Sequence, residues 1–392
     1  MARAKAARKT AGTATETETK TDPAPKTKRR KAASGVETKL VGMADVVINA
    51  AQRSKDPAFE IPIRALSNVS FSDTNHLIEL GDKVQSREFF NVSMAKKFMQ
   101  TFLVAGACKD LLESGKTTSI RDLFYMTKHT IKGHKENTFD DQVESDPIIE
   151  DLEVGLDALR EELHLFANKK GSMVGPMVIV DAGDEIDLAR MGSGGWSIPS
   201  ITEDYVIEFK KSEAEYIVLV EKEAVWHRLN EDKFWKKHKC MLVTGNGQAT
   251  RGVRRLMQRM ATELKVPVYV LVDSDPWGLY IYSVIKQGSI SLAYESMRMA
   301  VPKARFLGLR SRNFKKFKLS DDVKIELEQK DITRAKEMLA YPWFGAKHWQ
   351  EEISDMLEAG FKMEIEALSN KDISFVTDVY IPEKIAKREW LV

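Results

Sequence analysis

The chain has 392 residues, of which 43% are hydrophobic and 30% charged, and its net charge is +2 at pH 7. This length predicts about two or three domains with a sizeable core, and the longest apolar runs are of strand length, which excludes a bilayer-spanning helix. We find no N-terminal apolar run typical of a secretory signal. Two cysteines without a CxxC pattern exclude a disulfide framework and indicate reduced core thiols.

Positive charge is concentrated at the start of the chain. Residues 1–35 hold ten Lys and Arg against three Asp and Glu, a local charge of +7 that leaves −5 for the remainder. Because this segment has almost no large apolar residue, it cannot bury enough surface to offset ordering, and we expect a disordered basic tail over residues 1–37. The cluster at residues 26–31 suits DNA phosphates without sequence preference, but it equally suits a nuclear-localisation signal or a solubilising tail.

The segment after the tail, residues 38–74, is predicted to be a linker with an N-terminal docking segment. Residues 41–53 have helical spacing of apolar residues, which predicts a short docking helix. From residue 61 to about residue 90 the pattern alternates and is interrupted at Gly81-Asp82, which indicates short strands or the entry to a helix.

Two predicted helices follow, separated by a short turn. Residues 93–114 have strongly helical spacing, and Gly115 is a suitable end. The second helix covers residues 118–128, with Ser119 and Asp122 at capping-box spacing. Two helices joined by a turn of about three or four residues that contains glycine are typical of a helix-turn-helix.

A third helix is expected over residues 146–168, so the helix-turn-helix domain is assigned to residues 75–170. Beyond Gly171, strand-length apolar runs alternate with helices, which is typical of an α/β domain with a largely parallel sheet. The expected strands cover residues 177–181, 216–220, 241–243, 268–272 and 306–309, and the expected helices cover residues 249–264, 278–286, 332–339 and 346–368. This domain is assigned to residues 171–392, with helices dominating its C-terminal part.

Acidic residues follow two of the expected strands. Glu221 comes after the strand at 216–220, and Asp273 and Asp275 come after the strand at 268–272. Functional residues of a parallel sheet lie just past the carboxyl ends of its strands. Three convergent carboxylates repel one another unless a cation lies between them, and such ligands suit Mg²⁺, which could assist a leaving 3′ oxygen. Taken alone, Glu221 could be a helix N-terminal residue and the aspartates a turn.

A glycine-containing loop lies between the two acidic strands. Gly245 and Gly247 allow close approach of the backbone to a ligand, and the N-terminus of the following helix favours an anion. Arg251, Arg254 and Arg255 come next in the sequence. One interpretation is a phosphate-facing loop with an arginine lip, and the other is a strand-to-helix turn with a solvated basic face.

A tyrosine, Tyr125, lies in the second predicted helix of the helix-turn-helix. A Phe-Tyr pair on an amphipathic helix is usually core, and a free tyrosine hydroxyl with a pKa of about 10 is a poor nucleophile. Arg121, one turn earlier on the same face, could supply a positive field. Lys128, His129 and Lys132 could hold a DNA backbone. From these residues alone, Tyr125 is a candidate nucleophile and no more.

These stretches together resemble a known family, the A subunits of DNA topoisomerase VI, which are related to the meiotic double-strand-break transesterase. Residues 121–125, Arg-Asp-x-x-Tyr, resemble the catalytic motif of the family. Residues 220–223 together with 273–276 resemble its Toprim metal site. The loop at 244–247 and the segment at 191–200 resemble the topoisomerase branch. The resemblance extends from about residue 75 to the C-terminus.

The resemblance implies a fold and a set of roles. The fold would be a CAP-like winged-helix domain followed by a Toprim α/β domain with C-terminal helices. Tyr125 would attack DNA to form a 5′-phosphotyrosyl link, with Arg121 in the same catalytic motif. Glu221, Asp273 and Asp275 would hold Mg²⁺. The phosphate-facing candidates Gly245, Gly247, Arg251 and Lys128 come from the residue patterns above.

The family also implies partners. These are double-stranded DNA, a second copy of the chain whose Toprim site receives the tyrosine, and a separate GHKL-type B subunit that binds ATP in an A₂B₂ heterotetramer, with no membrane partner. Consistent with ATP binding elsewhere, the chain has no P-loop. We expect a cytoplasmic, nucleoid-associated enzyme, or a nuclear one in a eukaryote, that relaxes and decatenates DNA. The alternatives are a dedicated double-strand-break enzyme, a hydrolytic Toprim nuclease or primase, and a non-enzymatic DNA-binding protein.

Overall fold

The computed structural model describes residues 24–392, with side chains from residue 35 onward. Most of the expected basic tail, residues 1–23, lies outside the described residues. Helix α1 (Ala24–Gln52) extends across the boundary expected at residue 37 and includes the short helix expected at 41–53. Val36 and Leu40 are each 4% exposed and belong to the core of the N-terminal domain, which explains why the helix packs there.

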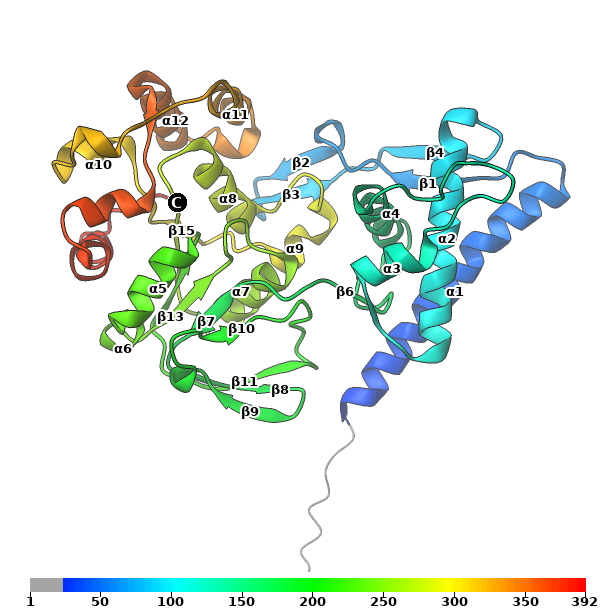
Figure 1. Ribbon diagram of the computed structural model, residues 1–392, viewed down its shortest axis with the longest axis horizontal. Coiled ribbons are helices and arrows are strands. Elements are labelled where there is room, and N and C mark those ends of the chain that lie inside the picture. Colours follow the sequence, from blue (N-terminus) through cyan, green and yellow to red (C-terminus); the bar gives the residue numbers. More distant parts are fainter. Residues whose placement is uncertain (1–23) are drawn as a thin grey trace, which may run out of the picture.

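Three further helices complete the N-terminal domain, and Figure 1 shows them gathered with α1 on one side of the molecule. They are α2 (Val92–Ser114), α3 (Ile120–Thr127) and α4 (Gln142–Gly155). Helix α2 ends at Gly115, which adopts the left-handed conformation that glycine favours. A short parallel ladder joins β5 (Thr118–Ser119) to β6 (Leu165–Phe166).

The third helix is shorter than the expected one at 146–168. Helix α4 ends at Gly155, and Asp157 has a φ of 44°, in the left-handed region that a helix cannot continue through. Leu156 and Leu163 are nevertheless buried in the same core. The apolar spacing therefore predicted burial correctly but the length of the helix wrongly.

The chain before α2 contributes to both domains. Strand β1 (Ala58–Pro62) pairs antiparallel with β4 (Val84–Glu88) in the N-terminal domain. The hairpin between them, β2 (Val69–Ser72) and β3 (Leu77–Leu80), packs on the other domain through Ile78. The Asn68 amide donates to the carbonyls of Ile63, Gly81 and Lys83, which holds together the two ends of the segment that carries this hairpin. The expected boundary near residue 75 thus falls inside a hairpin.

A six-stranded sheet forms the centre of the second domain. Its order is β10-β7-β13-β12-β14-β15, with the last four strands parallel and β7 and β10 antiparallel to their neighbours. The strands are β7 (Ser172–Val174), β10 (Trp196–Ser197), β12 (Tyr216–Val220), β13 (Cys240–Thr244), β14 (Val268–Leu271) and β15 (Arg305–Phe306). The largely parallel sheet expected from the sequence is confirmed.

One expected strand of this sheet belongs elsewhere. Strand β8 (Met177–Asp181) pairs with β9 (Asp184–Asp187) and β11 (Ile207–Ser212) in a separate antiparallel sheet. Ala182 and Gly183 both have positive φ, so β8 turns directly into β9 through a two-residue hairpin. A buried apolar run does not show which sheet it joins, and residues 171–392 therefore contain more than one sheet.

Both faces of the central sheet are covered. Ile217 and Leu219 of β12 point into one core, while Val218 and Val220 point into another, as expected for alternating side chains. Helices α7 (Arg251–Glu263) and α8 (Pro276–Gln287) contribute to the first core, and α5 (Glu223–Glu231) contributes to the second. The α/β class predicted from the sequence is therefore confirmed (Figure 1).

The remaining elements are mostly helical. They are α5 (Glu223–Glu231), α6 (Phe234–Lys237), α7 (Arg251–Glu263), α8 (Pro276–Gln287), α9 (Ser296–Met299), α10 (Ser311–Lys316), β16 (Ile325–Glu326), α11 (Gln329–Leu339), α12 (Lys347–Ala359), β17 (Phe361–Lys362) and α13 (Ile381–Ala386). Helix α12 ends at the left-handed Gly360, before the expected end at residue 368. In the described part of the chain, we find no helix with the length and hydropathy that crossing a membrane requires.

Candidate active site

Two of the predicted carboxylates meet at the carboxyl end of the central sheet. Strands β12 and β14 are parallel neighbours, with Val220 opposite Leu271. The next residue, Glu221, donates its backbone N–H to the Leu271 carbonyl at 3.0 Å. The Asp273 backbone N–H in turn donates to Glu221 Oε2 at 3.2 Å. Adjacent parallel strands thus bring these residues together, as the sequence predicted.

The third carboxylate, Asp275, also caps a helix. It is the N-cap of α8, and its Oδ1 accepts the Gly278 backbone N–H at 2.5 Å. Gly278 is tightly constrained, because a Cβ there would lie 2.6 Å from the Asp273 carbonyl oxygen. The turn allowed by the sequence is therefore present, and it also keeps Asp275 close to the other two carboxylates.

Burial and mutual repulsion make these carboxylates hard to ionise. Burial, followed by the charge of Asp273, raises the pKa of Glu221 to about 7. Burial also raises the pKa of Asp273 to about 6, although the Ile365 backbone N–H, which it accepts at 2.8 Å, and Lys222 oppose the shift. The pKa of Asp275 is raised for the same reason, burial. A cation among these groups would relieve the repulsion.

A lysine already lies beside the cluster. Lys222 Nζ lies 3.2 Å from Asp273 Oδ2 and 3.1 Å from carboxylate oxygens of both Glu364 and Glu366. These carboxylates raise the pKa of Lys222 even though burial opposes the shift. Sequence reasoning missed this role, although Lys222 adjoins Glu221. The two glutamates had no local signal, because they reach the site through the Ser274–Met363 bridge.

The donor set fits a cation that keeps much of its water. No three His, Cys, Asp or Glu side chains of the described residues are arranged as a metal cage. Mg²⁺, however, is commonly bound through one or two carboxylates together with several waters. Glu221 and Asp273, with the second oxygen of Asp275, supply hard ligands whose raised pKa values a divalent charge would lower.

The glycine loop lies directly beside these carboxylates. The Gly247 backbone N–H donates to the Glu221 carbonyl at 2.8 Å. Asn246 and Gly247 have φ values of 52° and 90°, and a Cβ at Gly247 would meet nothing within 4 Å. Gly245 is packed against Ala249 instead. Of the two predicted glycines, Gly247 is therefore the one with an open side.

The structure corrects the interpretation of the arginines after this loop as an exposed lip that faces phosphates. Arg251 Nη1 lies 2.8 Å from Glu153 Oε2, and its other nitrogen pairs with Glu295. Arg255 pairs with Glu203 at 2.9 Å, and Arg254 is only 3% exposed. The guanidinium of Arg251 thus links the N-terminal domain to the α/β domain rather than facing solvent. The sequence could not reveal this, since Glu153 lies 98 residues earlier.

Tyr125 lies on the exposed face of α3. Its side chain is 60% exposed, whereas the neighbouring Phe124 is 6% exposed and belongs to the core. The Ser119 hydroxyl accepts the Asp122 backbone N–H at 3.0 Å and so caps this helix, as its spacing predicted. The interpretation of Tyr125 as a core residue is therefore excluded. Arg121, one turn earlier, is also exposed.

Lys128, the phosphate-binding candidate at the C-cap of α3, already has partners within the chain. Lys128 Nζ donates to the Asp140 carbonyl at 2.9 Å and lies 5.1 Å from the centre of the Phe124 ring. It is exposed nonetheless. Helix α3 packs on α2, α4 and β5, all within the N-terminal domain. Tyr125 and the carboxylate cluster are therefore carried by different domains of the chain.

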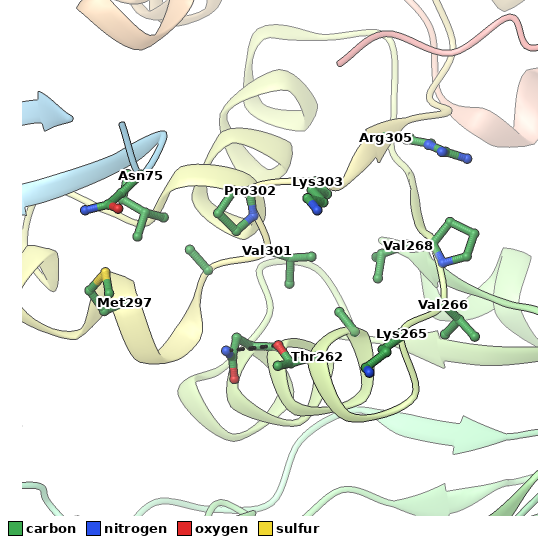
Figure 2. Close-up of a pocket in the computed structure, with 15 residues that line it drawn as sticks. Asn75, Thr262, Lys265, Val266, Val268, Met297, Val301, Pro302, Lys303 and Arg305 are labelled. Atoms are coloured by element: carbon green, nitrogen blue, oxygen red, sulfur yellow. Dashed lines mark hydrogen bonds between the residues drawn. The ribbon is translucent and has the colours of Figure 1, made fainter. Parts of the chain in front are cut away.

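A wide cavity lies away from the carboxylates, and Figure 2 shows its lining. Its volume is about 790 Å³, and it adjoins Val268 at the start of β14, the end of that strand opposite to Asp273. Val301 and Pro302 contribute apolar surface, Lys303 lies beside Pro302, and Arg305 lines a more distant part of the cavity (Figure 2). This cavity contains none of the predicted site residues.

Comparison with known proteins identifies the family. The model for the Toprim domain of Spo11 and of the topoisomerase 6 A subunit matches residues 216–385, and the model "Type IIB DNA topoisomerase" matches residues 96–165. The A subunit of type 2 DNA topoisomerase 6 from Pyrococcus horikoshii is 42% identical over 362 residues, covering 90% of this chain and 94% of the relative. The chain belongs to the A-subunit family of DNA topoisomerase VI.

Other members of this A-subunit family give the same picture. The protein of the same name from Sulfurisphaera tokodaii is 41% identical, over 93% of this chain and 97% of its own length. The A3 subunit of DNA topoisomerase 6 from Oryza sativa subsp. indica is 34% identical, over 85% of this chain and 74% of its own length. An "All-beta domain in DNA topoisomerase VI alpha subunit" matches residues 169–213, the region of the separate sheet β8-β9-β11.

Proposed function

We propose that this chain is the DNA-cleaving and rejoining subunit of a type IIB topoisomerase, with Tyr125 as its nucleophile. The observation that carries the proposal is the exposed tyrosine on a capped helix of a chain that also holds three neighbouring carboxylates at the end of its central sheet. The Tyr125 oxygen bonds to a backbone phosphorus, and the bond from phosphorus to the 3′ oxygen breaks. The tyrosine gives up its proton to water and the departing 3′ oxygen takes one up from water, so that the resulting 3′-hydroxyl can later reverse the reaction.

Residues of both domains have assigned roles in this proposal. Arg121, on the same face of α3 as Tyr125, provides positive charge near the phosphate. Mg²⁺ held by Glu221, Asp273 and Asp275 would neutralise phosphodiester charge and assist departure of the 3′ oxygen. Lys128 holds the DNA backbone close to α3, and Gly247, with Gly245 shaping the loop, presents an open backbone surface to the phosphates. Arg251 is no longer part of this set.

The assembly completes the site in the same proposal. Tyr125 and the carboxylates lie on different domains of one chain, and, as the family resemblance implies, we assign the Toprim site of a second copy as the acceptor of the tyrosine. A homodimer then cuts both strands of duplex DNA. Resealing conserves the bond energy, so ATP is needed only for strand passage and is bound by a GHKL-type B subunit in an A₂B₂ complex. Such an enzyme relaxes and decatenates DNA in the cytoplasm, on the nucleoid, or in a eukaryotic nucleus.

The CAP-like winged-helix arrangement of the N-terminal domain is part of the proposal. It is supported by the turn at Gly115 between α2 and α3 and by the packing of α4 against both. An antiparallel bridge between Thr130 and Asn137, directly after α3, has the position of a wing. The wing would contact DNA beside Tyr125.

The test mixes the chain with its ATPase partner, Mg²⁺, ATP and supercoiled plasmid, followed by a detergent quench. Wild type should give protein covalently attached to 5′ ends, whereas Tyr125→Phe should give no adduct and no cleavage because it lacks the attacking oxygen. Met126→Leu, at an exposed position of the same helix, is the control and should cleave normally.

Other outcomes would redirect the proposal. Cut DNA without an adduct, unchanged in Tyr125→Phe, would make the chain a hydrolytic Toprim nuclease. Adducts without any relaxation, even in the presence of the partner and ATP, would favour a dedicated break-making enzyme. DNA binding with no cleavage in the complete assembly would favour the non-enzymatic alternative.

A further inference from the structure

A second cavity lies where the N-terminal domain meets the Toprim side. Its volume is about 340 Å³. Glu150 and Arg160 line it from the N-terminal domain, while Thr250 and Arg254 at the start of α7 and Ser289 after α8 line it from the other. None of the three clustered carboxylates belongs to its lining. It therefore lies beside the glycine loop, through Gln248 and Ala249, but does not include the carboxylates of the proposed cleavage site.

The cavity contains a buried arginine without a partner. Arg254 is 3% exposed, and its Nε and Nη2 atoms have no hydrogen-bond partner among the described residues. These two nitrogens form one edge of the guanidinium, the edge that binds two oxygens of a phosphate or carboxylate side by side. Burial and the nearby charge of Arg251 lower the pKa of Arg254 to about 10, so the charge is poorly compensated.

The other charged side chains around the cavity are matched. Glu150 lies 2.5 Å from Arg64, and Arg160 lies 2.7 Å from Glu153. Glu161 pairs with Arg298, and Arg251 pairs with Glu153 at 2.8 Å. Within the described part of this lining, the charge of Arg254 is the one left over. A buried, unpaired charge is strongly unfavourable. An anion bound beside Arg254 would remove this cost.

Two further features favour an anion at the same place. The Ser289 hydroxyl is buried, with the residue 7% exposed, and its oxygen lacks a partner in the described structure. Helix α7, of 13 residues, begins with Thr250 as its N-cap on the cavity wall. The positive end of a helix dipole attracts phosphate groups.

We propose that this interdomain cavity binds a phosphate group, held by the free edge of Arg254, the Ser289 hydroxyl and the N-terminal end of α7. The phosphate is either free inorganic phosphate or a phosphate of the DNA backbone. Its charge compensates Arg254, and its oxygens join α7 to the segment after α8. Because residues of both domains line the cavity, phosphate binding stabilises their contact.

The test measures binding of radiolabelled inorganic phosphate to the full chain by equilibrium dialysis in phosphate-free buffer. Wild type should bind about one phosphate per chain. Arg254→Met should weaken binding at least about tenfold, since a charge-assisted bidentate contact is lost, and Ser289→Ala should weaken it about threefold. Arg53→Met, at an exposed position directly after α1, is the matched control and should bind as wild type does.

Several results would overturn the proposal. One is the absence of saturable phosphate binding to wild type, and another is an Arg254→Met protein that binds phosphate as tightly as wild type. A third is displacement of the labelled phosphate by acetate as effectively as by unlabelled phosphate. Each of these results would contradict a phosphate site at Arg254. Arg254→Met should unfold at the same temperature as phosphate-free wild type or higher, since it removes an unpaired buried charge. If that variant does not fold, loss of affinity in Ser289→Ala against an unchanged Arg53→Met decides the question.

A second arm separates the two sources of phosphate. A short DNA duplex is added to the protein with bound phosphate. Release of the labelled phosphate from wild type would identify the DNA backbone as the ligand. Retention of the label while the duplex binds would identify free phosphate as the ligand. Release and retention are both possible only if the cavity binds phosphate. If Arg254→Met bound and retained the labelled phosphate as fully as wild type, the proposed site would be contradicted.

Discussion

Burial opposes ionisation of the carboxylates at the end of the sheet, and the contacts that hold them offset this only in part. Asp273 is 6% exposed and accepts one backbone N–H, from Ile365, while Lys222 lies 3.2 Å from its other oxygen. The pKa of Asp273, about 6, shows that these contacts do not fully offset burial. The buried charge of Asp273 therefore costs the metal-free protein some stability, and a bound cation would offset that cost.

Asp273→Asn tests this balance. In metal-free alkaline buffer the variant should be more stable than wild type by about 1–2 kcal/mol, because a carboxylate with a raised pKa is removed while Ile365 keeps its acceptor. Wild type should gain stability when Mg²⁺ is added, and the variant should gain much less and should not cleave DNA. Thermal unfolding with and without Mg²⁺ checks this.

The control for that comparison is Glu366→Gln. Its side chain is 40% exposed, so we expect little change in stability and a retained Mg²⁺ effect. An Asp273→Asn protein that is stabilised by Mg²⁺ as strongly as wild type would show that the metal ligands lie elsewhere.

At the scale of elements, sequence patterns worked best where burial was uniform. Strand β12 has the predicted bounds because five apolar residues lie between polar ends, and the same logic located β14. Since parallel strands end at one edge, the positions of Glu221 and Asp273 after their strands were enough to predict that they lie together. The exposure of Tyr125 could not be decided, because α3 has aromatic residues on two faces.

Patterns failed where backbone conformation or distant partners decided the outcome. Helix α4 ends at Gly155, although apolar spacing continues. Strand β8 joined a separate sheet because of the turn at Ala182-Gly183. Lys222 and Arg251 have partners from distant segments, Glu364 and Glu153, that no local motif announces.

Gly278→Ala tests the element that positions the aspartates. The new Cβ would lie 2.6 Å from the Asp273 carbonyl oxygen, a backbone atom that cannot move without displacing the strand end. We expect a loss of about 1–3 kcal/mol in the free energy of unfolding and a clear loss of cleavage. Chemical denaturation and the plasmid assay measure the two effects.

The matched control is another helical glycine. A Cβ at Gly106 in α2 would meet nothing within 4 Å, so Gly106→Ala should raise stability by up to about 1 kcal/mol through helix propensity. Equal behaviour of the two alanine variants would show that the close approach at Gly278 does not constrain the site.

At the scale of the whole molecule, buried ion pairs hold the two domains together. Glu153, 1% exposed, accepts from Arg160 of its own domain at 2.7 Å. From the Toprim side, Arg251 and the Tyr294 hydroxyl donate to it at 2.8 Å and 2.6 Å. Burial opposes the charge of Glu153, but the two arginines outweigh burial and lower its pKa. The position of α3 relative to the carboxylates depends on this contact.

Breaking that contact should therefore affect both stability and cleavage. Glu153→Gln leaves two arginines without their shared carboxylate, and we expect a loss of about 3–5 kcal/mol, whereas Arg251→Met should cost less because Glu153 keeps Arg160. In the double variant the losses should not add, since the two residues share one interaction. A sum of the single effects would mean that Glu153 and Arg251 act independently.

The same contact predicts the sign of a pH effect. Because the pKa of Glu153 is lower in the folded protein than its ordinary value of 4.5, the carboxylate contributes stability above that value. This contribution falls away as the pH drops through the lowered folded value. The gap in unfolding temperature between wild type and Glu153→Gln should thus be constant near neutrality and shrink in acid. A gap that widened in acid would mean that Glu153 is protonated in the folded protein, and the domain contact would then need another source.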